Sequence, residues 1–203
     1  MIKNLVFDLG NVIVDLDYST AFAPLGIPSE LFENIYNTDF FHTFEKGEVT
    51  EDDFFNFLCD GFSFKCKDIP ILKKTLHQAF PLRPKVWKML EALKSSHHIF
   101  MLSNTNILDF GSLEEQYPLR EPFEKVYLSY EQGHRKPDAS TWVHAENFFN
   151  INSEETLFLD DRIENIEAAA KHGWDTIHVL SEKQLFESLL DRHIISKIPK
   201  END

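Results

Sequence analysis

The sequence predicts a doubly wound α/β fold, in which helices flank a parallel β-sheet and a helical segment is inserted after the first strand. Five short apolar runs are continuous rather than alternating, as expected for strands buried on both faces of a parallel sheet. Helical patterns lie between the later runs. The stretch 16–82 contains helical patterns and no convincing strand. The 203 residues suffice for one full core with such an insertion, but not for two large domains.

The expected strands and helices alternate along the chain. The apolar runs are "NLVF" (4–7), "HIFML" (98–102), "KVYL" (125–128), "TLFL" (156–159) and "TIHVL" (176–180). The helical patterns that accompany them span 83–96, 106–117, 138–149, 162–173 and 181–193. Gly173 stands where a glycine commonly ends a helix. This alternation assigns residues 1–15 and 83–203 to one α/β core domain.

The inserted stretch 16–82 is expected to form a helical cap subdomain. Its four helical patterns span 28–38, 39–48, 50–62 and 68–80. Thr50 and Asp53 form a plausible N-cap pair for the third pattern. Phenylalanines concentrate here, at positions 40, 41, 44, 54, 55, 57, 62 and 64. Aromatic residues at helical spacing indicate a small packed core rather than a substrate-facing wall.

The composition indicates an acidic globular protein. Hydrophobic residues make up 42% of the chain and the formal net charge is −14, with a pI near 5.0. Such a chain lacks the basic surface that displaces counterions from nucleic acid, and an anionic membrane surface does not attract it. We therefore expect no nucleic-acid partner and no membrane partner. A monomer and a homodimer both remain open.

The terminus and the cysteines predict a soluble cytoplasmic protein. The first residues contain no apolar signal-peptide region, and no apolar run approaches the ~20 residues of a membrane span. Cys59 and Cys66 match neither a disulfide framework nor a zinc-binding spacing, so we interpret both as reduced thiols.

Polar residues follow four of the five expected strands. Asp8 follows the first, Ser103 and Asn104 the second, Ser129 the third, and the pair Asp160–Asp161 the fourth. In open α/β sheets, ligands bind at the carboxyl ends of the strands. The sequence therefore predicts the functional site at this edge, with the cap directly above it.

Three carboxylates at one edge predict a metal site. Two like charges ~4 Å apart repel by about 4 kcal/mol at an effective dielectric near 20, so Asp8, Asp160 and Asp161 call for a cation. Oxygen ligands suit Mg²⁺, which needs one or two carboxylates together with a substrate phosphate. Lys136, in "GHRKPD", adds a fixed positive charge.

These groups together favour phosphoryl chemistry. Phosphoryl transfer depends mainly on positioning and charge neutralisation, which a metal, Lys136, Ser103 and Asn104 can supply. Asp8 can then attack phosphorus and form an aspartyl-phosphate that water later releases. A structural ion pair would explain Lys136 with one aspartate, but not the whole set of polar groups at strand ends.

Four motifs, "FDLGNVIVD", "MLSNTN", "RKPD" and "FLDDRIENIEAA", resemble in order and spacing those of the haloacid dehalogenase-like (HAD) hydrolase superfamily. The resemblance implies a Rossmann-like core and a Mg²⁺-dependent phosphatase. The stretch "FHTFEKGEVTEDDFFNFL" resembles the helical cap of the subfamily that contains bacterial α-D-glucose-1-phosphatase. By position, the resemblance implies a nucleophile and metal ligand at Asp8, phosphate binding by Ser103, Asn104, Asn11 and Lys136, a metal ligand at Asp160, a ligand or supporting partner at Asp161, and an orienting role for Asn165.

The chain departs from the family pattern at Gly10. Most phosphatases of this superfamily carry there an aspartate that protonates the leaving alcohol and then activates water. The Gly10 carbonyl can still bind the metal, but general acid–base help is typically worth 10²–10⁴-fold. A leaving group that departs easily, such as that of a sugar-1-phosphate, is one explanation. A substitute acid is another, with Asp15, Asp17, His42 and Glu45 as candidates.

Three functions follow from these observations. The first is a phosphatase for a small phosphorylated metabolite, with sugar phosphates ahead of nucleotides. The second is a non-enzymatic protein that binds a phosphorylated ligand, with activity weak or lost because of Gly10. A 2-haloacid dehalogenase is more distant, because those enzymes need no metal and carry a different motif after the nucleophile.

Overall fold

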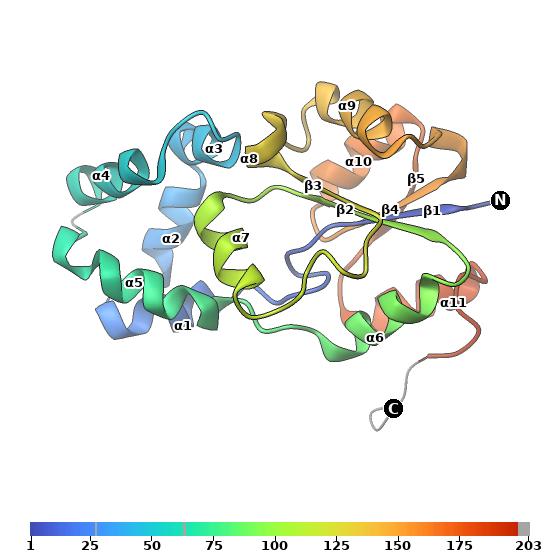
Figure 1. Cartoon of the computed structure of the whole chain (residues 1–203), viewed down its shortest axis with the longest axis horizontal. Helices are drawn as coiled ribbons and strands as arrows, with labels where there is room; N and C mark the ends of the chain where they lie inside the picture. The colour runs from blue at the N-terminus through green and yellow to red at the C-terminus, as the bar shows by residue number, and fades with distance from the viewer. Residues whose placement is uncertain (27, 63, 199–203) are drawn as a thin grey trace.

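A computed structural model describes residues 1–26, 28–62 and 64–198 (Figure 1). Its centre is a five-stranded sheet in the order β3–β2–β1–β4–β5, with every neighbouring pair parallel. This confirms the doubly wound α/β prediction. The strands are β1 (Asn4–Phe7), β2 (His98–Ser103), β3 (Lys125–Leu128), β4 (Thr156–Asp160) and β5 (Asp175–His178).

Helices cover both faces of the sheet (Figure 1). Leu5 and Phe7 of β1 point into one apolar cluster and Val6 into the other, and all three are fully buried. A central strand with two buried faces has no solvent-facing position, which explains the apolar run at positions 5–7. The core helices are α6 (Pro84–Leu93), α7 (Ile107–Glu114), α8 (Ser129–Gln132), α9 (Ala139–Phe149), α10 (Ile163–His172) and α11 (Glu182–Asp191).

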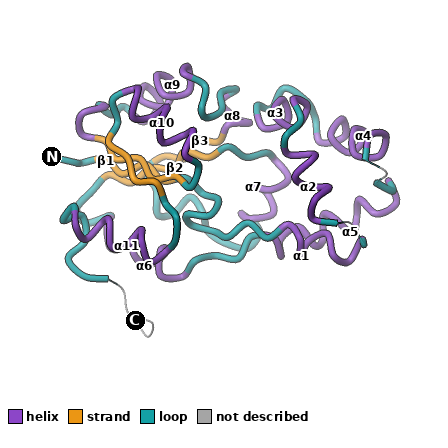
Figure 2. The backbone as a smooth tube through the Cα atoms, turned by 180° about the vertical axis from the view of Figure 1, so that it is seen from behind, coloured by secondary structure: helices purple, strands orange, loops and turns teal. Residues whose placement is uncertain are grey.

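The chain between β1 and α6 forms a group of helices at one end of the molecule, here called the cap (Figure 2). It has an apolar cluster of its own, in which the rings of Phe44 and Phe54 stack 4.5 Å apart. The phenylalanines of this stretch therefore form mainly a packed core, as expected. The cap comprises α1 (Tyr18–Phe22), α2 (Ser29–Tyr36), α3 (Asp39–Glu45), α4 (Glu51–Gly61), α5 (Ile69–Thr75) and the 3-10 helices η1 (Ala23–Leu25), η2 (Cys66–Asp68) and η3 (Leu76–Ala79).

Local capping explains where two cap helices begin. Thr50 and Asp53 form a reciprocal capping box at the start of α4, which confirms the predicted pair. The side chain of Asp17 accepts a hydrogen bond from the backbone N–H of Thr20 at the start of α1. Helix α1 was not predicted from the sequence, because its five residues are too few for a helical period to be visible.

The cysteine interpretation was wrong. Cys59, near the end of α4, is disulfide-bonded rather than a reduced thiol. The chain turns back after α4 so that η2 packs against this helix, a contact that the spacing of the cysteines in the sequence does not show. The cysteines therefore give no support to a cytosolic location.

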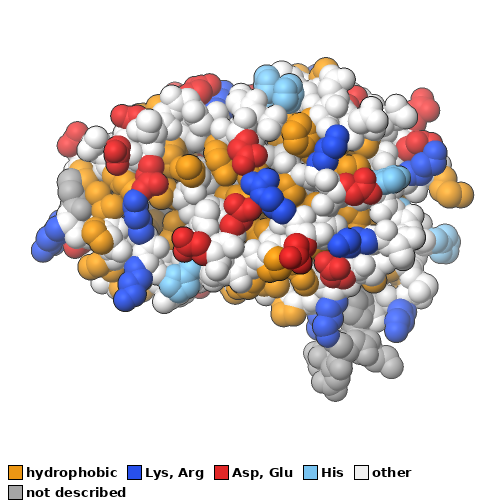
Figure 3. Space-filling model, in the orientation of Figure 1, with side chains coloured by type: hydrophobic (Ala, Val, Ile, Leu, Met, Phe, Trp, Pro, Cys, Tyr) orange, Lys and Arg blue, Asp and Glu red, His pale blue; other side chains and the backbone are white. Residues whose placement is uncertain are grey.

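The surface is mixed in character. On the face drawn in Figure 3, basic and acidic side chains are interspersed with apolar ones. Among the described residues, no helix combines the length and the apolar character needed to cross a bilayer.

Candidate active site

The carboxyl end of the central strand carries Asp8 between two neighbours that also end in polar residues. Strand β1 pairs with β2 on one side and β4 on the other, with Phe7 opposite Met101 and Leu159. The Asp8 backbone N–H continues the ladder by donating to the Leu159 carbonyl at 2.9 Å. The predicted convergence of polar groups at this edge follows from parallel pairing in this register.

Lys136 joins the two buried carboxylates of this edge. Its Nζ donates to Asp8 Oδ1 at 2.7 Å, to Asp160 Oδ2 at 2.7 Å and to the Leu102 carbonyl at 2.9 Å. The residue is only 1% exposed. All three ammonium protons therefore have acceptors, which is the condition for burying a lysine at modest cost.

The loop that carries Lys136 is held by Asn104. The Asn104 Oδ1 accepts from the Lys136 backbone N–H at 2.8 Å, and its Nδ2 donates to the Lys136 carbonyl at 2.8 Å. Both ends of this amide are thus engaged with the backbone of Lys136. In this structure Asn104 positions the lysine, whereas the sequence argument placed it beside the phosphate.

Asp160 is oriented by hydrogen bonds from the chain that follows it. The Arg162 backbone N–H donates to its Oδ1 at 2.8 Å, and Asn165 Nδ2 lies 3.0 Å from both carboxylate oxygens. Because Asn165 lies in the first turn of α10, the helix start fixes the Asp160 rotamer. Asp161 accepts a hydrogen bond from Asn11 Nδ2 at 2.9 Å.

The three carboxylates suit a cation. Asp8, Asp160 and Asp161 each offer an oxygen, and these atoms lie within 4.8 Å of one another. Hard divalent cations prefer oxygen ligands at such spacings. The residues therefore fit a Mg²⁺ ion that would share the site with Lys136.

Burial and the close spacing of these charged groups shift their pKa values. Burial raises the pKa of Asp8 to about 7, and Asp160 and Asp161 add to the rise while Lys136 opposes it. Burial also raises the pKa of Asp161. For Lys136, burial lowers the pKa, but Asp160 and Asp8 more than offset it and hold the ammonium charged. An added cation would favour the ionised carboxylates.

The turn after Asp8 is tight and leaves little room for a side chain at position 10. Asn11 adopts a left-handed conformation with φ 53°, and its carbonyl accepts a hydrogen bond from the Arg83 guanidinium. A Cβ atom on Gly10 would lie 2.9 Å from Cδ1 of Leu16. The Leu16 side chain therefore fills the space where an acidic side chain at position 10 would begin.

A cavity of about 410 Å³ opens above the strand ends. Asp8, Ser103 and Lys136 lie on its core side, and residues of the cap close the other side. The cavity lining includes both apolar side chains, such as Phe41 and Phe80, and polar ones. It can therefore hold a small molecule with its anionic end at Lys136.

The four candidate acids lie in different places. Asp15 pairs with Arg83, whose Nε donates to it at 2.8 Å, and Asp17 caps α1. Neither lines the cavity, and His42 does not either. Glu45 does line it, but both nitrogens of the Arg135 fork lie 2.8 and 3.0 Å from its Oε2.

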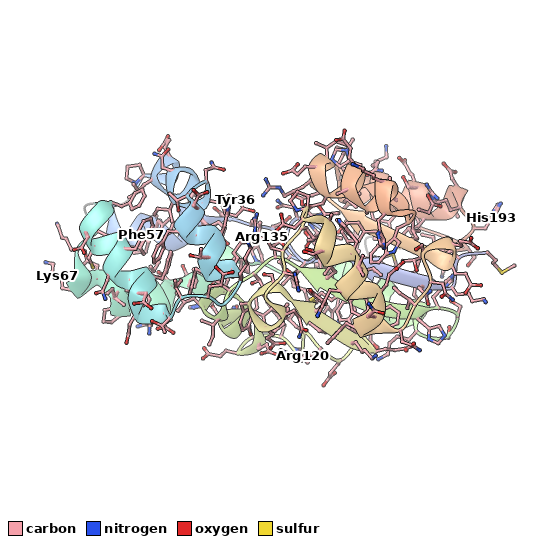
Figure 4. All side chains as sticks on the ribbon, turned by 90° about the horizontal axis from the view of Figure 1, so that it is seen from above. Tyr36, Phe57, Lys67, Arg120, Arg135 and His193 are labelled. Carbon is pink, nitrogen blue, oxygen red and sulfur yellow. The ribbon has the colours of Figure 1, made fainter. Side chains whose placement is uncertain are left out.

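Cap and core meet through polar contacts beside this cavity. Arg162 donates to the Tyr36 hydroxyl, and its guanidinium lies 5.4 Å from the centre of the Tyr36 ring. The Arg135–Glu45 pair forms a second contact between the two parts. Figure 4 shows Tyr36 and Arg135 at the boundary between the cap helices and the core.

Asp109 is a cavity residue that the sequence argument missed. It lies in the first turn of α7, and it lines the same cavity as Asp8 and Ser103. The available signal was its position six residues after Ser103, just beyond a strand end. An acidic residue in the first turn of a helix is ordinarily explained by its favourable interaction with the helix dipole. The sequence alone therefore offers no separate reason to predict a functional role for Asp109.

Comparison with known proteins agrees with this geometry. The chain matches the sequence model of the haloacid dehalogenase-like hydrolase family over residues 2–173. A D-ribitol-5-phosphate phosphatase of Bacteroides thetaiotaomicron is 31% identical over 191 residues, covering 87% of this chain and 91% of the relative. A sesquiterpene phosphatase of Aspergillus oryzae is 25% identical, covering 87% and 89%.

Solved structures show the same fold. A HAD family enzyme of Bacteroides thetaiotaomicron, in complex with magnesium and inorganic phosphate, superimposes with a TM-score of 0.76 at 26% identity, covering 92% of this chain and 100% of that one. A HAD-like hydrolase of Porphyromonas gingivalis gives a TM-score of 0.79 at 24% identity, covering 95% and 98%. The fold and site define a hydrolase with a strand-end aspartate. This chain belongs to the haloacid dehalogenase-like hydrolase family.

Proposed function

We propose that this protein is a Mg²⁺-dependent phosphatase that hydrolyses a small phosphorylated metabolite, with a sugar or polyol phosphate as the first choice. One observation carries the proposal. Lys136 Nζ lies 2.7 Å from both Asp8 and Asp160 at the base of a cavity large enough for a small molecule. A charged lysine fixed beside a carboxylate at a strand end suits a nucleophile that receives a dianionic phosphoryl group.

In this proposal Asp8 attacks phosphorus and becomes an aspartyl-phosphate. Lys136 neutralises charge on the nucleophile and on the phosphoryl oxygens, and the Ser103 hydroxyl donates to one of those oxygens. Asn104 holds the backbone of Lys136, and Asn165 holds Asp160. Asn11 donates a hydrogen bond to Asp161, and in this proposal it also contacts the phosphate.

The residues that would hold Mg²⁺ are Asp8, the backbone carbonyl of Gly10 and the acidic pair Asp160–Asp161. Bound there, the ion would neutralise phosphoryl charge and counter the mutual repulsion of the carboxylates. The relevant support is the spacing of their oxygens within 4.8 Å and the magnesium complex of the Bacteroides enzyme.

The substrate class rests on the relative and on the cavity. The relative that shares 31% of its residues acts on a polyol phosphate, and Tyr36, Glu45 and Arg162 offer hydrogen bonds to hydroxyl groups at the cap side of the cavity. A second candidate is a phosphorylated terpenoid alcohol. It is favoured by the apolar side chains Leu16, Phe41 and Phe80 in the same lining and by the sesquiterpene phosphatase relative.

We assign residues 1–15 and 83–203 to the catalytic core and 16–82 to the cap; positions 27, 63 and 199–203 lie outside the described residues. The cap helices α1 and α2 each contribute one residue to the cavity lining, and α3 contributes two. Since the phosphoryl-binding groups all lie in the core, selection among leaving groups would be the task of the cap. Closure of the cap over a substrate would exclude bulk water from the cavity while the leaving group departs.

The test is phosphate release with and without Mg²⁺ from p-nitrophenyl phosphate, ribitol 5-phosphate, glucose 1-phosphate and farnesyl phosphate. The wild type should release phosphate only with the metal, and Asp8→Asn should abolish release. Asp60→Asn, an exposed aspartate on α4, is the matched control and should behave as the wild type. Binding of phosphate without release from any ester would favour the ligand-binding alternative. Metal-independent halide release from a 2-haloacid would indicate a dehalogenase.

A further inference from the structure

We propose that Asp109 is the catalytic acid and base of this site and takes the place of the carboxylate that is missing at Gly10. This inference rests on the proposed phosphatase function and deepens it. Asp109 comes from a different part of the fold, the first turn of α7 after strand β2, whereas position 10 lies in the loop after β1.

The carboxyl group of Asp109 is held in one orientation with one oxygen left available. Its Oδ2 accepts hydrogen bonds from the Tyr18 hydroxyl at 3.0 Å and from Asn106 Nδ2 at 2.9 Å. Its Oδ1 has no hydrogen-bond partner among the described residues and is not sealed from solvent. Since Asp109 lines the cavity, this oxygen is the one that can meet a bound molecule.

The location suits a leaving group rather than the phosphoryl group. In-line attack by Asp8 places the departing oxygen on the side of phosphorus away from Asp8, toward the cap. Asp109 is bonded to Tyr18 of cap helix α1, so it lies at the cap side of the cavity. Asp8 and Lys136 line the same cavity, so a molecule bound in it lies beside all three residues.

The surroundings of Asp109 favour a carboxyl group that exchanges a proton. Burial raises its pKa to about 6, against the opposing effect of the hydrogen bonds from Asn106 and Tyr18. The titratable groups that face it are the Tyr18 hydroxyl from α1 and the Glu45 carboxyl from α3. The negative charge of Asp109 helps to raise the pKa of both groups. No ion-pair partner of Asp109 is found among the described residues.

Glu45 is the competing candidate, and its partners argue against it. Its Oε2 accepts a hydrogen bond from Nε of Arg135 at 3.0 Å and lies 2.8 Å from Nη2 in an ion pair, and its side chain is 3% exposed. Giving up a negative charge there would leave the buried Arg135 guanidinium unpaired, which is costly. No such cation pairs with Asp109 among the described residues. When Asp109 is protonated, the groups left beside it, the Tyr18 hydroxyl and the Asn106 amide, are themselves uncharged.

The proposed proton path balances in both steps. As Asp8 Oδ bonds to phosphorus, the bond from phosphorus to the ester oxygen breaks, and the proton of the Asp109 carboxylic acid moves to that oxygen, giving a free alcohol and an Asp109 carboxylate. Water then attacks phosphorus and transfers a proton to Asp109. The bond from phosphorus to Asp8 breaks, which releases phosphate and restores the starting state of both residues.

The test uses Asp109→Asn in the full-length protein and compares kcat/KM across leaving groups. For alkyl phosphates such as ribitol 5-phosphate we expect a fall of about 10²–10⁴-fold. For p-nitrophenyl phosphate, whose leaving group needs no proton, kcat/KM should change by less than about 5-fold, because an acid contributes little to a good leaving group. A burst of p-nitrophenolate should then appear, since the second step has lost its base.

Two further variants keep the assignment falsifiable if Asp109→Asn folds poorly. Tyr18→Phe removes a hydrogen bond that lowers the pKa of Asp109, so the basic limb of the rate profile for alkyl phosphates should move to higher pH. The second adds Gly10→Asp and Leu16→Ala to the Asp109→Asn protein, where the loss of the Leu16 side chain makes room at the 2.9 Å contact. These two changes should raise kcat/KM for alkyl phosphates at least about 10-fold above that of Asp109→Asn alone.

The outcomes separate the two proposals. Equal losses for all esters with no burst, or a leaving-group-dependent loss in Glu45→Gln instead of Asp109→Asn, would overturn the role of Asp109. An inactive wild type would refute the phosphatase function itself. The urea midpoint of each variant distinguishes a loss of fold from a loss of chemistry.

Discussion

Removing Lys136 should destabilise the protein through the two carboxylates that it joins. In Lys136→Met, Asp8 and Asp160 would face each other without a cation, with oxygens within 4.8 Å. Two charges at that distance repel by about 3 kcal/mol at an effective dielectric of about 20. Breaking a buried ion pair on one side typically costs about 3–5 kcal/mol. We expect a loss in that range, which lowers Tm by roughly 6–20 °C for a chain of this length.

Urea denaturation of the metal-free protein at pH 7.5 measures this loss. Burial has already raised the pKa of Asp8 to about 7, and loss of the lysine raises this pKa further. Because protonation of Asp8 removes its repulsion with Asp160, the difference in free energy of unfolding between the variant and the wild type should become smaller as the pH falls toward 5. Mg²⁺ should narrow it as well, since the ion replaces the lost charge. Lys85→Met is the matched control, because Lys85 makes only a surface contact with Glu182 at 3.8 Å, and it should cost less than about 1 kcal/mol. A Lys136 variant as stable as its control would refute the reasoning.

Three other predictions concern the cap, the metal and pH. Phe44→Ala should cost about 3–5 kcal/mol in urea denaturation, because the ring is 1% exposed and stacks on Phe54; an effect below about 1 kcal/mol would show that the cap core contributes little to folding. Mg²⁺ at 100 times its Kd should stabilise the wild type by about 2.7 kcal/mol, and Asp161→Asn should show much less of this stabilisation in calorimetry; an undiminished effect would place the ion elsewhere. The raised pKa of Asp109 (about 6, against 3.8) means that the folded state binds its proton more tightly. The wild type should therefore lose stability relative to Asp109→Asn as the pH rises from about 4 to 7, and a pH-independent difference would contradict the raised pKa.

The strands and the core of the site could be predicted because each depends on a local pattern. A strand buried on both faces has a continuous apolar run, and parallel pairing brings the residues after such runs to one edge. Asp8, Ser103 and Asp160 were predicted in this way. In the structure Lys136 joins Asp8 to Asp160, and Ser103 lines the same cavity as Asp8 and Lys136. The helical cap was visible because its phenylalanines recur at helical spacing.

The remaining parts depend on contacts between distant residues, which no local pattern shows. Asp15 was a reasonable acid beside the nucleophile loop until Arg83, 68 residues later in the chain, was seen to pair with it. The bridge at Cys59 depends on where the chain turns after α4. Asp109 reaches the cavity because α7 lies beneath the cap, and a single acidic residue at a helix start gives no sign of that.

The central place of β1 has a consequence for how the protein is made. This strand is made before the other four, and its partner in β4 lies 152 residues later, as the Asn4–Thr156 contact shows. Closing so long a loop is slow, and a nascent chain folds only after the partner segment has emerged. The cap, whose contacts are local, can form before then. The carboxylate cluster of Asp8 and Asp160 can therefore assemble only after β4 has been synthesised and paired with β1.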